Sequence, residues 1–292
     1  LWMMCLQFSC KGDPVNEPDF DELINEDAET IVHDGLTREY LLHMPSSYTG
    51  TTALPLVLNF HGFGGTASDH MEAADMRSLA NSDNFILVYP QGAFLDGDTH
   101  WNSGLDTPDN KSDVDDLGFI EALLDELAAN YNIDPERIYA CGYSNGSFFS
   151  YALACYLSDR IASIGSVAGA MMEETHDNCA PTHPTAMINV HGTSDGVVQY
   201  NGGTGMKSVP ESVDYWTNFN NCNATPVTDQ FDDNGTVIEQ FEYQDGDSSV
   251  AVVHYKVNGG GHVWDDSWNF QGANTSRLIW EFLSQFNVHG RI

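Results

Sequence analysis

Basic residues are scarce in this chain of 292 residues. Lys and Arg together number 10, against 43 Asp and Glu, which gives a formal net charge of −33 when His is neutral. A surface this negative repels the phosphates of nucleic acids and of anionic lipids. We therefore exclude nucleic acid and an anionic lipid surface as binding partners, and interpret the charge as a solvated acidic surface.

Paired metal-binding cysteines are also lacking. The chain has no C-x-x-C pair, and no His/Cys spacing fits a zinc site, so we expect no metal. Four of the six cysteines lie in the body of the chain, and an exported protein could pair them. We expect a Cys155–Cys179 disulfide and leave Cys141 and Cys222 open, the alternative being four buried free thiols.

No apolar run is long enough to span a bilayer. Residues 1–9 are apolar but short, and we interpret them as the tail of a signal peptide. Cys10 resembles the acceptor cysteine of a bacterial lipoprotein, although Gln7 departs from that motif. Residues 11–28 indicate an acidic linker. We expect an exported protein, either secreted or periplasmic or held at the cell surface by a lipid on Cys10.

Strands and helices alternate from residue 29 to the end. The patterns predict a hairpin over 29–45 and strands over 54–62, 84–92, 137–142, 161–169, 185–192, 236–244 and 249–257. Helical spacing predicts helices over 68–83, 112–132, 144–159, 209–221 and 273–286. Such alternation favours a mostly parallel sheet covered by helices on both faces. The sequence thus predicts one α/β domain over 29–292, built as a three-layer sandwich.

The pattern Gly-x-Ser-x-Gly occurs twice, at 142–146 and at 192–196. It is the nucleophile-elbow pattern of α/β-hydrolases, in which the serine lies on a sharp turn between a strand and a helix. A predicted strand precedes Ser144 and a predicted helix follows it. Ser194 also follows a strand, but the stretch after it is rich in turn residues. We therefore predict Ser144 as the nucleophile and regard the second copy as coincidence.

Candidates for an acid and a base follow Ser144 in the order these hydrolases use. Asp195 comes directly after a buried strand, where ligands of open α/β sheets bind. Among the later histidines, His254 lies inside a predicted strand and His289 lies near the C-terminus. His262 lies in a glycine-rich loop and is our predicted base. Ser144 would attack a carbonyl carbon while His262 takes its proton and Asp195 orients the imidazole.

The resulting oxyanion needs backbone N–H donors. We predict Asn145, which follows the nucleophile, and Phe63 of "HGFGG", with Gly64 as the alternative to Phe63. Trp101 and Trp264 are the predicted substrate-facing aromatics, with a packed structural role as the alternative for each. Three acidic residues are interpreted as helix-start residues rather than as ligands, namely Asp113, Asp115 and Asp116.

Several motifs together resemble the feruloyl esterase and poly(3-hydroxybutyrate) depolymerase-like family, carbohydrate esterase family 1 in its broad sense. They are "NFHGFGG", "VYPQG", "WNSG", "DVDDLGFI", "GYSNG", "VHGTSDGVVQYNGG" and "GGGHVW". The resemblance covers about residue 30 to the end and implies an α/β-hydrolase fold, esterase activity without a cofactor, and the same triad of Ser144, Asp195 and His262. Some relatives carry paired cysteines after the Trp-Asn motif, and this chain has none there.

We therefore expect a serine carboxylic ester hydrolase that removes feruloyl or acetyl groups from a polysaccharide or from small esters. The enzymatic alternative is a depolymerase of polyhydroxyalkanoate or its oligomers. We rank it second because the chain has neither a linker nor a polymer-binding domain. A non-catalytic binding protein on the same fold is the alternative from another class. The oligomeric state stays open.

Overall fold

The computed structural model describes residues 25, 27–95, 97–104 and 110–292. Its main sheet has ten strands, which are β1 (Glu29–His33), β2 (Leu36–His43), β3 (Leu54–Phe60), β4 (Ile86–Pro90), β7 (Ile133–Tyr143), β8 (Ser163–Val167), β9 (Ala186–Gly192), β10 (Val227–Asp233), β11 (Thr236–Tyr243) and β12 (Val252–Val257). Two small hairpins pair β5 (Ala93–Leu95) with β6 (Asp98–His100) and β13 (Phe286–Asn287) with β14 (Gly290–Arg291).

The strand order is β1-β2-β4-β3-β7-β8-β9-β12-β11-β10. The six central strands, from β4 to β12, pair in parallel. Antiparallel strands complete both edges, β1 and β2 on one side and β11 and β10 on the other. The central strands are buried on both faces, so they read as nearly continuous apolar runs.

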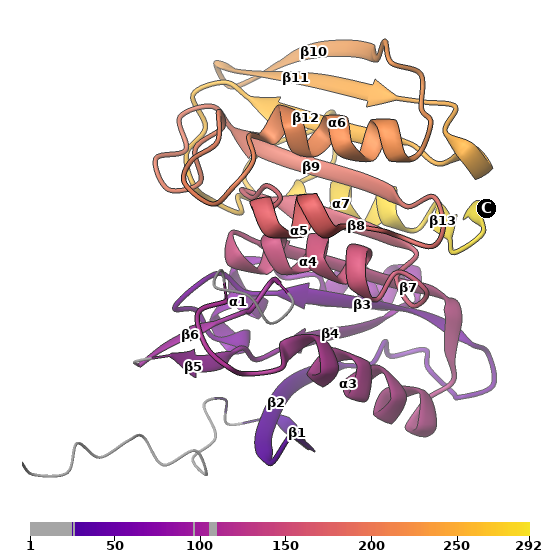
Figure 1. Ribbon diagram of the computed structural model, residues 1–292. Helices are drawn as coiled ribbons and strands as arrows, with labels where there is room; N and C mark the ends of the chain where they lie inside the picture. The colour runs from indigo at the N-terminus through magenta and orange to yellow at the C-terminus, as the bar shows by residue number, and fades with distance from the viewer. Residues whose placement is uncertain (1–24, 26, 96, 105–109) are drawn as a thin grey trace, which may run out of the picture.

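Helices cover both faces of the sheet (Figure 1). They are α1 (Ala67–Ala73), α2 (Arg77–Asp83), α3 (Asp116–Asn130), α4 (Asn145–Tyr156), α5 (Glu173–Asn178), α6 (Val209–Phe219) and α7 (Thr275–Leu283). One core packs α1, α2 and α7 on one face of the sheet, and the other packs α3, α4 and α6 on the opposite face. Alternate residues of β3 serve the two cores: Val57 faces the first, and Leu56 and Leu58 face the second. The predicted three-layer α/β architecture is confirmed.

The helix predicted over 68–83 is in fact two helices, α1 and α2. The side chain of Asp75 accepts a hydrogen bond from the N–H of Arg77 at 2.9 Å. Asp side chains compete in this way with the helical backbone pattern, and here the competition ends one helix and starts the next. The short helix α5, the exposed edge strand β10 and the hairpin of β5 and β6 were not predicted.

Part of the predicted linker packs against the domain. Asn25 is 2% exposed, and its side-chain amide donates to Glu39 at 2.7 Å and to Gln91 at 3.1 Å. Its Oδ1 accepts from the N–H of Ser68 at 3.1 Å. The expected boundary at residue 29 is therefore too late. The predicted lipid site at Cys10 lies outside the described residues.

The cysteines differ in state. Cys155 and Cys179 form the expected disulfide, which ties α4 to the segment after α5. Cys141 is a buried free thiol and Cys222 a half-buried one. In the described part of the chain, no helix has both the length and the apolar character needed to cross a membrane.

Candidate active site

Ser144 lies on a sharp turn between β7 and α4, with φ 55° and ψ −116°. Few residues other than glycine adopt a positive φ, because the side chain then crowds the backbone. Both flanking glycines are required by close approach. A Cβ at Gly146 would lie 2.2 Å from the Phe60 carbonyl oxygen, and one at Gly142 would lie 2.4 Å from that of Gly146. The turn thus exposes the Ser144 hydroxyl at the end of β7, as a nucleophile elbow does.

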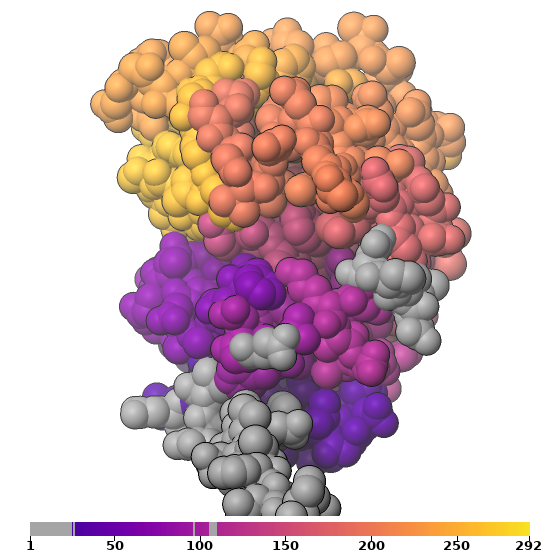
Figure 2. Space-filling view, turned by 60° about the vertical axis from the view of Figure 1, so that its left-hand side comes forward, coloured from indigo at the N-terminus to yellow at the C-terminus, as the bar shows by residue number. Residues whose placement is uncertain are grey.

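The structure brings the three predicted triad residues into one hydrogen-bond chain. His262 Nε2 lies 2.9 Å from Ser144 Oγ, and His262 Nδ1 lies 2.7 Å from Asp195 Oδ2. The three side chains come from the ends of β7 and β9 and from the loop after β12. The carboxyl ends of all three strands lie on the same side of the molecule, at the left of Figure 1, and this side comes forward in Figure 2. In this geometry the imidazole can accept the hydroxyl proton while the carboxylate holds the ring.

Asp195 is 5% exposed and is surrounded by donors. Its Oδ1 accepts from the N–H groups of Val197 and Val198, both at 2.9 Å. Burial by itself raises the pKa of this carboxyl, but hydrogen bonds from His191, His262 and Val197 outweigh burial and lower the pKa to about 2. The carboxylate is therefore ionised at any pH where the protein would work, and its charge stabilises an imidazolium at His262.

The second Gly-x-Ser-x-Gly copy joins the two loops that carry Asp195 and His262. A Cβ at Gly192 would lie 2.2 Å from the Gly260 carbonyl oxygen, so the two backbones touch there. The Ser194 N–H donates to that same carbonyl at 2.9 Å. A Cβ at Gly196 would meet nothing within 4 Å. Ser194 thus lies on a loop that holds the acid beside the base, and no helix follows it directly.

Hydrogen bonding separates the two alternatives for the second oxyanion donor. The Gly64 N–H donates to the Thr99 carbonyl at 2.7 Å and is therefore occupied. No hydrogen bond engages the Phe63 N–H within the described residues. A Cβ at the neighbouring Gly62 would lie 3.3 Å from Ser144 Cβ, so this loop passes beside the nucleophile. Phe63 and the free first-turn N–H of Asn145 are the donors this geometry offers.

His61 holds that loop in place, a role the sequence did not reveal. Its Nε2 accepts from the Gly92 N–H at 2.9 Å, which leaves Nδ1 protonated to donate to the Gly62 carbonyl at 2.7 Å. Burial lowers the pKa of His61 to about 4, so the ring is neutral and keeps this tautomer.

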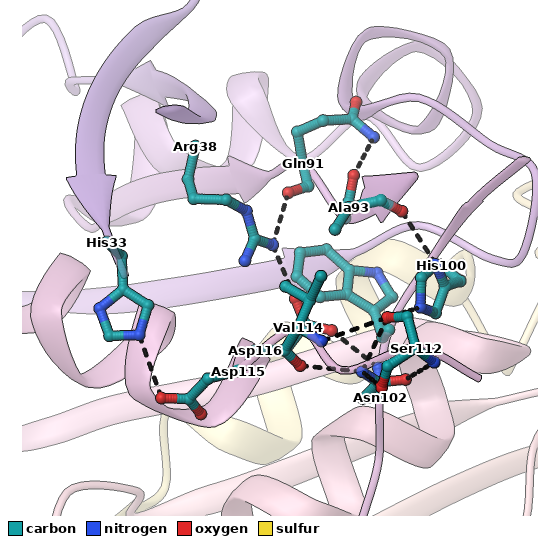
Figure 3. A network of polar contacts seen from close by, with 12 residues as sticks. His33, Arg38, Gln91, Ala93, His100, Asn102, Ser112, Val114, Asp115 and Asp116 are labelled. Carbon is teal, nitrogen blue, oxygen red and sulfur yellow. Dashed lines mark hydrogen bonds and ion pairs between the residues drawn. The ribbon is translucent and has the colours of Figure 1, made fainter. Parts of the chain in front are cut away.

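The Asn145 side chain attaches α4 to the "WNSG" segment. Its Oδ1 accepts from the Trp101 N–H at 2.7 Å, and its Nδ2 donates to the Trp101 carbonyl at 3.0 Å. The next residue, Asn102, donates from its backbone to Asp116 at 2.8 Å, and Asp116 also pairs with Arg38 at 2.7 Å (Figure 3). A buried ion pair between β2 and α3 therefore supports Asn145, the residue that follows Ser144.

Asp115 and Asp116 differ in role. Asp115 caps α3 by accepting from the Gly118 N–H at 2.9 Å, as predicted for a helix-start residue. Asp116 is also at the start of α3, but it is 1% exposed and forms a buried ion pair with Arg38 rather than capping the helix.

The structure does not support the predicted substrate-facing role of the two tryptophans. Trp101 is 1% exposed, stacks on Phe149 at 5.0 Å between ring centroids and donates from Nε1 to the His61 carbonyl. Trp264 is 6% exposed and donates to Ser276 at 3.1 Å. Trp101 packs in one core and Trp264 in the other, so both have the packed structural role that was the alternative. Sequence position near a catalytic residue does not tell which way a side chain points.

Phe63 is instead an exposed aromatic residue on the loop that passes beside Ser144. Its side chain is 45% exposed, and the ammonium of Lys111 lies 3.9 Å from its ring centroid. Among the described residues, no cluster of three or more His, Cys, Asp or Glu side chains could hold a metal ion.

Comparison with characterised proteins places these features in a family. A family model described as "Putative esterase" matches residues 35–274. Feruloyl esterase B of Piromyces equi is 29% identical over 262 residues, which cover 86% of this chain and 46% of that protein. The bifunctional acetylxylan esterase/xylanase XynS20E of Neocallimastix patriciarum is 26% identical, covering 88% and 35%. The chain thus spans less than half the length of these two relatives.

A further relative adds to the family comparison, and two solved structures show the same fold. Poly(3-hydroxyalkanoate) depolymerase C of Paucimonas lemoignei is 25% identical, covering 85% of this chain and 57% of that protein. The Bacillus cereus carboxylesterase superposes with a TM-score of 0.53 at 17% identity, covering 85% and 93%. A thermostable esterase gives 0.56 at 16%, covering 89% and 62%. The chain therefore belongs to the esterase family of the matching model and has the α/β-hydrolase fold.

Proposed function

We propose that the protein is a serine carboxylic ester hydrolase that works through an acyl-enzyme. The observation that carries the proposal is the hydrogen-bond chain from Ser144 through His262 to Asp195, with the serine on a strained elbow. Ser144 Oγ attacks the ester carbonyl, and its proton moves to His262 Nε2. The N–H groups of Asn145 and Phe63 stabilise the oxyanion.

The two half-reactions use the same groups. As the tetrahedral intermediate collapses, the C–O bond to the alcohol breaks and His262 gives its proton to the leaving oxygen. Water then attacks the acyl-enzyme, its proton passes to His262, and the carboxylic acid leaves as Ser144 regains its proton. Asp195 stays ionised throughout because its pKa is held near 2.

The substrate is an ester of a feruloyl or acetyl group on a polysaccharide, or a small ester with such a group. This proposal is supported by the names of relatives, a feruloyl esterase and an acetylxylan esterase, that align over most of the chain. A depolymerase of polyhydroxyalkanoate or its oligomers is the second candidate, supported by the relative from Paucimonas lemoignei. A non-catalytic binding protein would need no such hydrogen-bonded triad.

A comparison of kcat/KM on four substrates separates these candidates: p-nitrophenyl acetate, methyl ferulate, acetylated xylan and a soluble hydroxybutyrate oligomer. Each tenfold preference corresponds to about 1.4 kcal/mol of transition-state stabilisation. Preference for methyl ferulate or acetylated xylan is the expected result. Preference for the oligomer would replace the first candidate with the second. No turnover of any of the four by folded protein would favour the binding protein.

The protein is proposed to act after export, free or held by a lipid on Cys10. The Cys155–Cys179 disulfide supports export, because disulfides persist mainly in oxidising compartments. Fractionation of cells that produce the protein from its own gene tests this. Recovery from the medium, periplasm or membrane pellet is expected, and release from the pellet in Cys10→Ser would show that the protein is held there through Cys10. Recovery from the cytosol would contradict export.

A further inference from the structure

His191 lies at the end of β9, four residues before Asp195, and its side chain is completely buried. Its Nε2 lies 2.8 Å from the Val198 carbonyl oxygen and 3.3 Å from Asp195 Oδ2. Its Nδ1 lies 3.3 Å from the Gly169 carbonyl oxygen. Oxygen acceptors therefore face both ring nitrogens, and two of the three belong to the loop that carries the acid.

The same short loop is held from both sides. Asp195 Oδ1 accepts from the N–H of Val198, and the carbonyl of Val198 accepts from His191. The other carboxylate oxygen lies between His262 Nδ1 at 2.7 Å and His191 Nε2 at 3.3 Å. Removing the donor at His191 leaves the buried Val198 carbonyl without this partner, and it takes away one of the two ring nitrogens beside Asp195 Oδ2.

We propose that His191 is a positioning residue for the triad, which fixes the carboxylate of Asp195 against His262 without touching Ser144. The inference rests on the proposed hydrolase function. Side chains alternate along β9, so His191 shares its face with Met187, which packs in a core, and with Asn189, whose amide bonds to Ser166 and Gly169. An imidazole at this depth costs free energy unless it is hydrogen-bonded, and its shortest contact, at 2.8 Å, is with the Val198 carbonyl of the acid loop.

The electrostatics of Asp195 agree with this role. Burial raises the pKa of the Asp195 carboxyl, and the contacts with His191 and His262 both lower it again. Two further side chains, Tyr200 and His254, lie near His191. The ring centroid of Tyr200 lies 5.9 Å from that of His191, and the Tyr200 hydroxyl bonds to His254 Nε2 at 2.9 Å. Neither of them contacts Asp195.

Two substitutions separate positioning from packing. In His191→Gln the amide nitrogen occupies the place of Nε2 and still donates to the loop, whereas in His191→Leu no donor remains. A displacement of about 1 Å in a catalytic group costs on the order of 10²-fold. We expect His191→Leu to lose kcat on p-nitrophenyl acetate by about this factor with KM unchanged, and His191→Gln to recover most of the loss.

His183→Leu is the matched control, because His183 precedes the same strand at its other end and its two nitrogens also contact backbone carbonyls, of Pro184 and Ser158. Its kcat should equal that of the wild type. The rates of the His191 and His183 variants are divided by the amount of enzyme that a fluorophosphonate labels at completion, and the rate of Ser144→Ala by its protein concentration. If His191→Leu does not fold, His191→Asn replaces it, since the shorter amide does not reach the position of Nε2.

Three outcomes overturn the inference: an unchanged kcat in His191→Leu, a loss in His183→Leu as large as in His191→Leu, or no recovery in His191→Gln. Ser144→Ala is measured in parallel. If Ser144→Ala keeps its activity, the hydrolase proposal itself fails. If Ser144→Ala is inactive while His191→Leu is fully active, only the role of His191 is wrong.

Discussion

At the scale of single residues, Ser144 combines a reactive position with a strained backbone. A positive φ at a non-glycine residue costs on the order of 1–3 kcal/mol and persists only where the surroundings impose it. Here the surroundings are the contacts of Gly142 and Gly146 with neighbouring carbonyls. The strain holds the hydroxyl 2.9 Å from His262 Nε2.

The two Gly-x-Ser-x-Gly copies give a matched pair of substitutions. Gly146→Ala should lose activity and destabilise the fold by several kcal/mol, because its Cβ would lie 2.2 Å from a carbonyl oxygen of β3. Gly196→Ala should change the free energy of unfolding by less than about 0.5 kcal/mol, because the space around it is open. Urea unfolding and kcat of both variants check this. A tolerated Gly146→Ala would contradict the elbow geometry.

Asp195→Asn should lower kcat at neutral pH by roughly 10³–10⁴-fold, because an amide favours the wrong tautomer of His262.

The pH dependence of stability should also change in Asp195→Asn. The folded-state pKa of about 2 lies below the usual value, so the carboxylate stabilises the fold above about pH 4, and this contribution is lost as the pH falls toward 2. Unfolding free energies at several pH values between these limits should fall less steeply in Asp195→Asn. Parallel curves for the two proteins would contradict the lowered pKa.

Sequence reasoning selected the three residues that the structure joins in one hydrogen-bond chain, because each has a local context: a strand and helix around Ser144, and strand ends before Asp195 and His262. It could not place the roles that depend on side-chain direction. Trp101 and Trp264 lie close to site residues in sequence yet point into the cores. His191 stands inside the quoted motif "VHGTSDG", but only the folded loop brings its Nε2 to the acid.

At the scale of elements, the site depends on contacts between segments far apart in sequence. The Arg38–Asp116 pair joins β2 to α3. Asp116 also accepts a hydrogen bond from the backbone of the "WNSG" segment, and the side chain of Asn145, at the start of α4, bonds to the same segment. The sequence predicted each of these elements by its periodicity. It did not reveal the ion pair, because the sequence pattern around a charged residue in a strand or at a helix start does not tell whether its side chain is exposed to solvent or buried against an opposite charge.

Breaking the Arg38–Asp116 pair from one side should cost about 3–5 kcal/mol, because the remaining charge stays buried without its partner. The double variant Arg38→Met/Asp116→Leu should lose clearly less than the sum of Arg38→Met and Asp116→Leu. Urea unfolding of the four proteins in a double-mutant cycle measures this. Additive losses would show that the two side chains are not coupled.

The differences between predicted and observed elements have local causes. The helix expected over 68–83 is divided because the side chain of Asp75 bonds to the backbone of Arg77. The edge strand β10 carries mostly exposed polar residues, so it lacks the apolar pattern that marks the central strands. Helix α5 has six residues, too few to show a helical period.

At the scale of the whole molecule, one covalent link supplements the two cores. The Cys155–Cys179 bond joins residues with a sequence separation of 24. A disulfide that closes a loop of this length stabilises a fold by about 3 kcal/mol, because it restricts the unfolded chain. Its position between α4 and the segment after α5 ties together elements on the face of the sheet opposite α7.

Reduction should therefore lower the Tm of the wild-type protein. The double variant Cys155→Ala/Cys179→Ala should show the lower Tm from the start and should not respond to the reductant. Thermal unfolding with and without dithiothreitol checks both. Cys222→Ser is the control for the half-buried free thiol and should behave as the wild type does. A wild-type Tm that reductant leaves unchanged, with the thiols shown to be free, would contradict a stabilising role.

The central claim is that Ser144 is the nucleophile of a serine hydrolase. Its most direct test is labelling with a fluorophosphonate, followed by mass spectrometry of the intact protein and its peptides. One label per chain at Ser144 is the predicted result. It should disappear in Ser144→Ala together with ester hydrolysis, and it should persist in Ser194→Ala. A label on Ser194, or ester hydrolysis that survives in Ser144→Ala, would contradict the account.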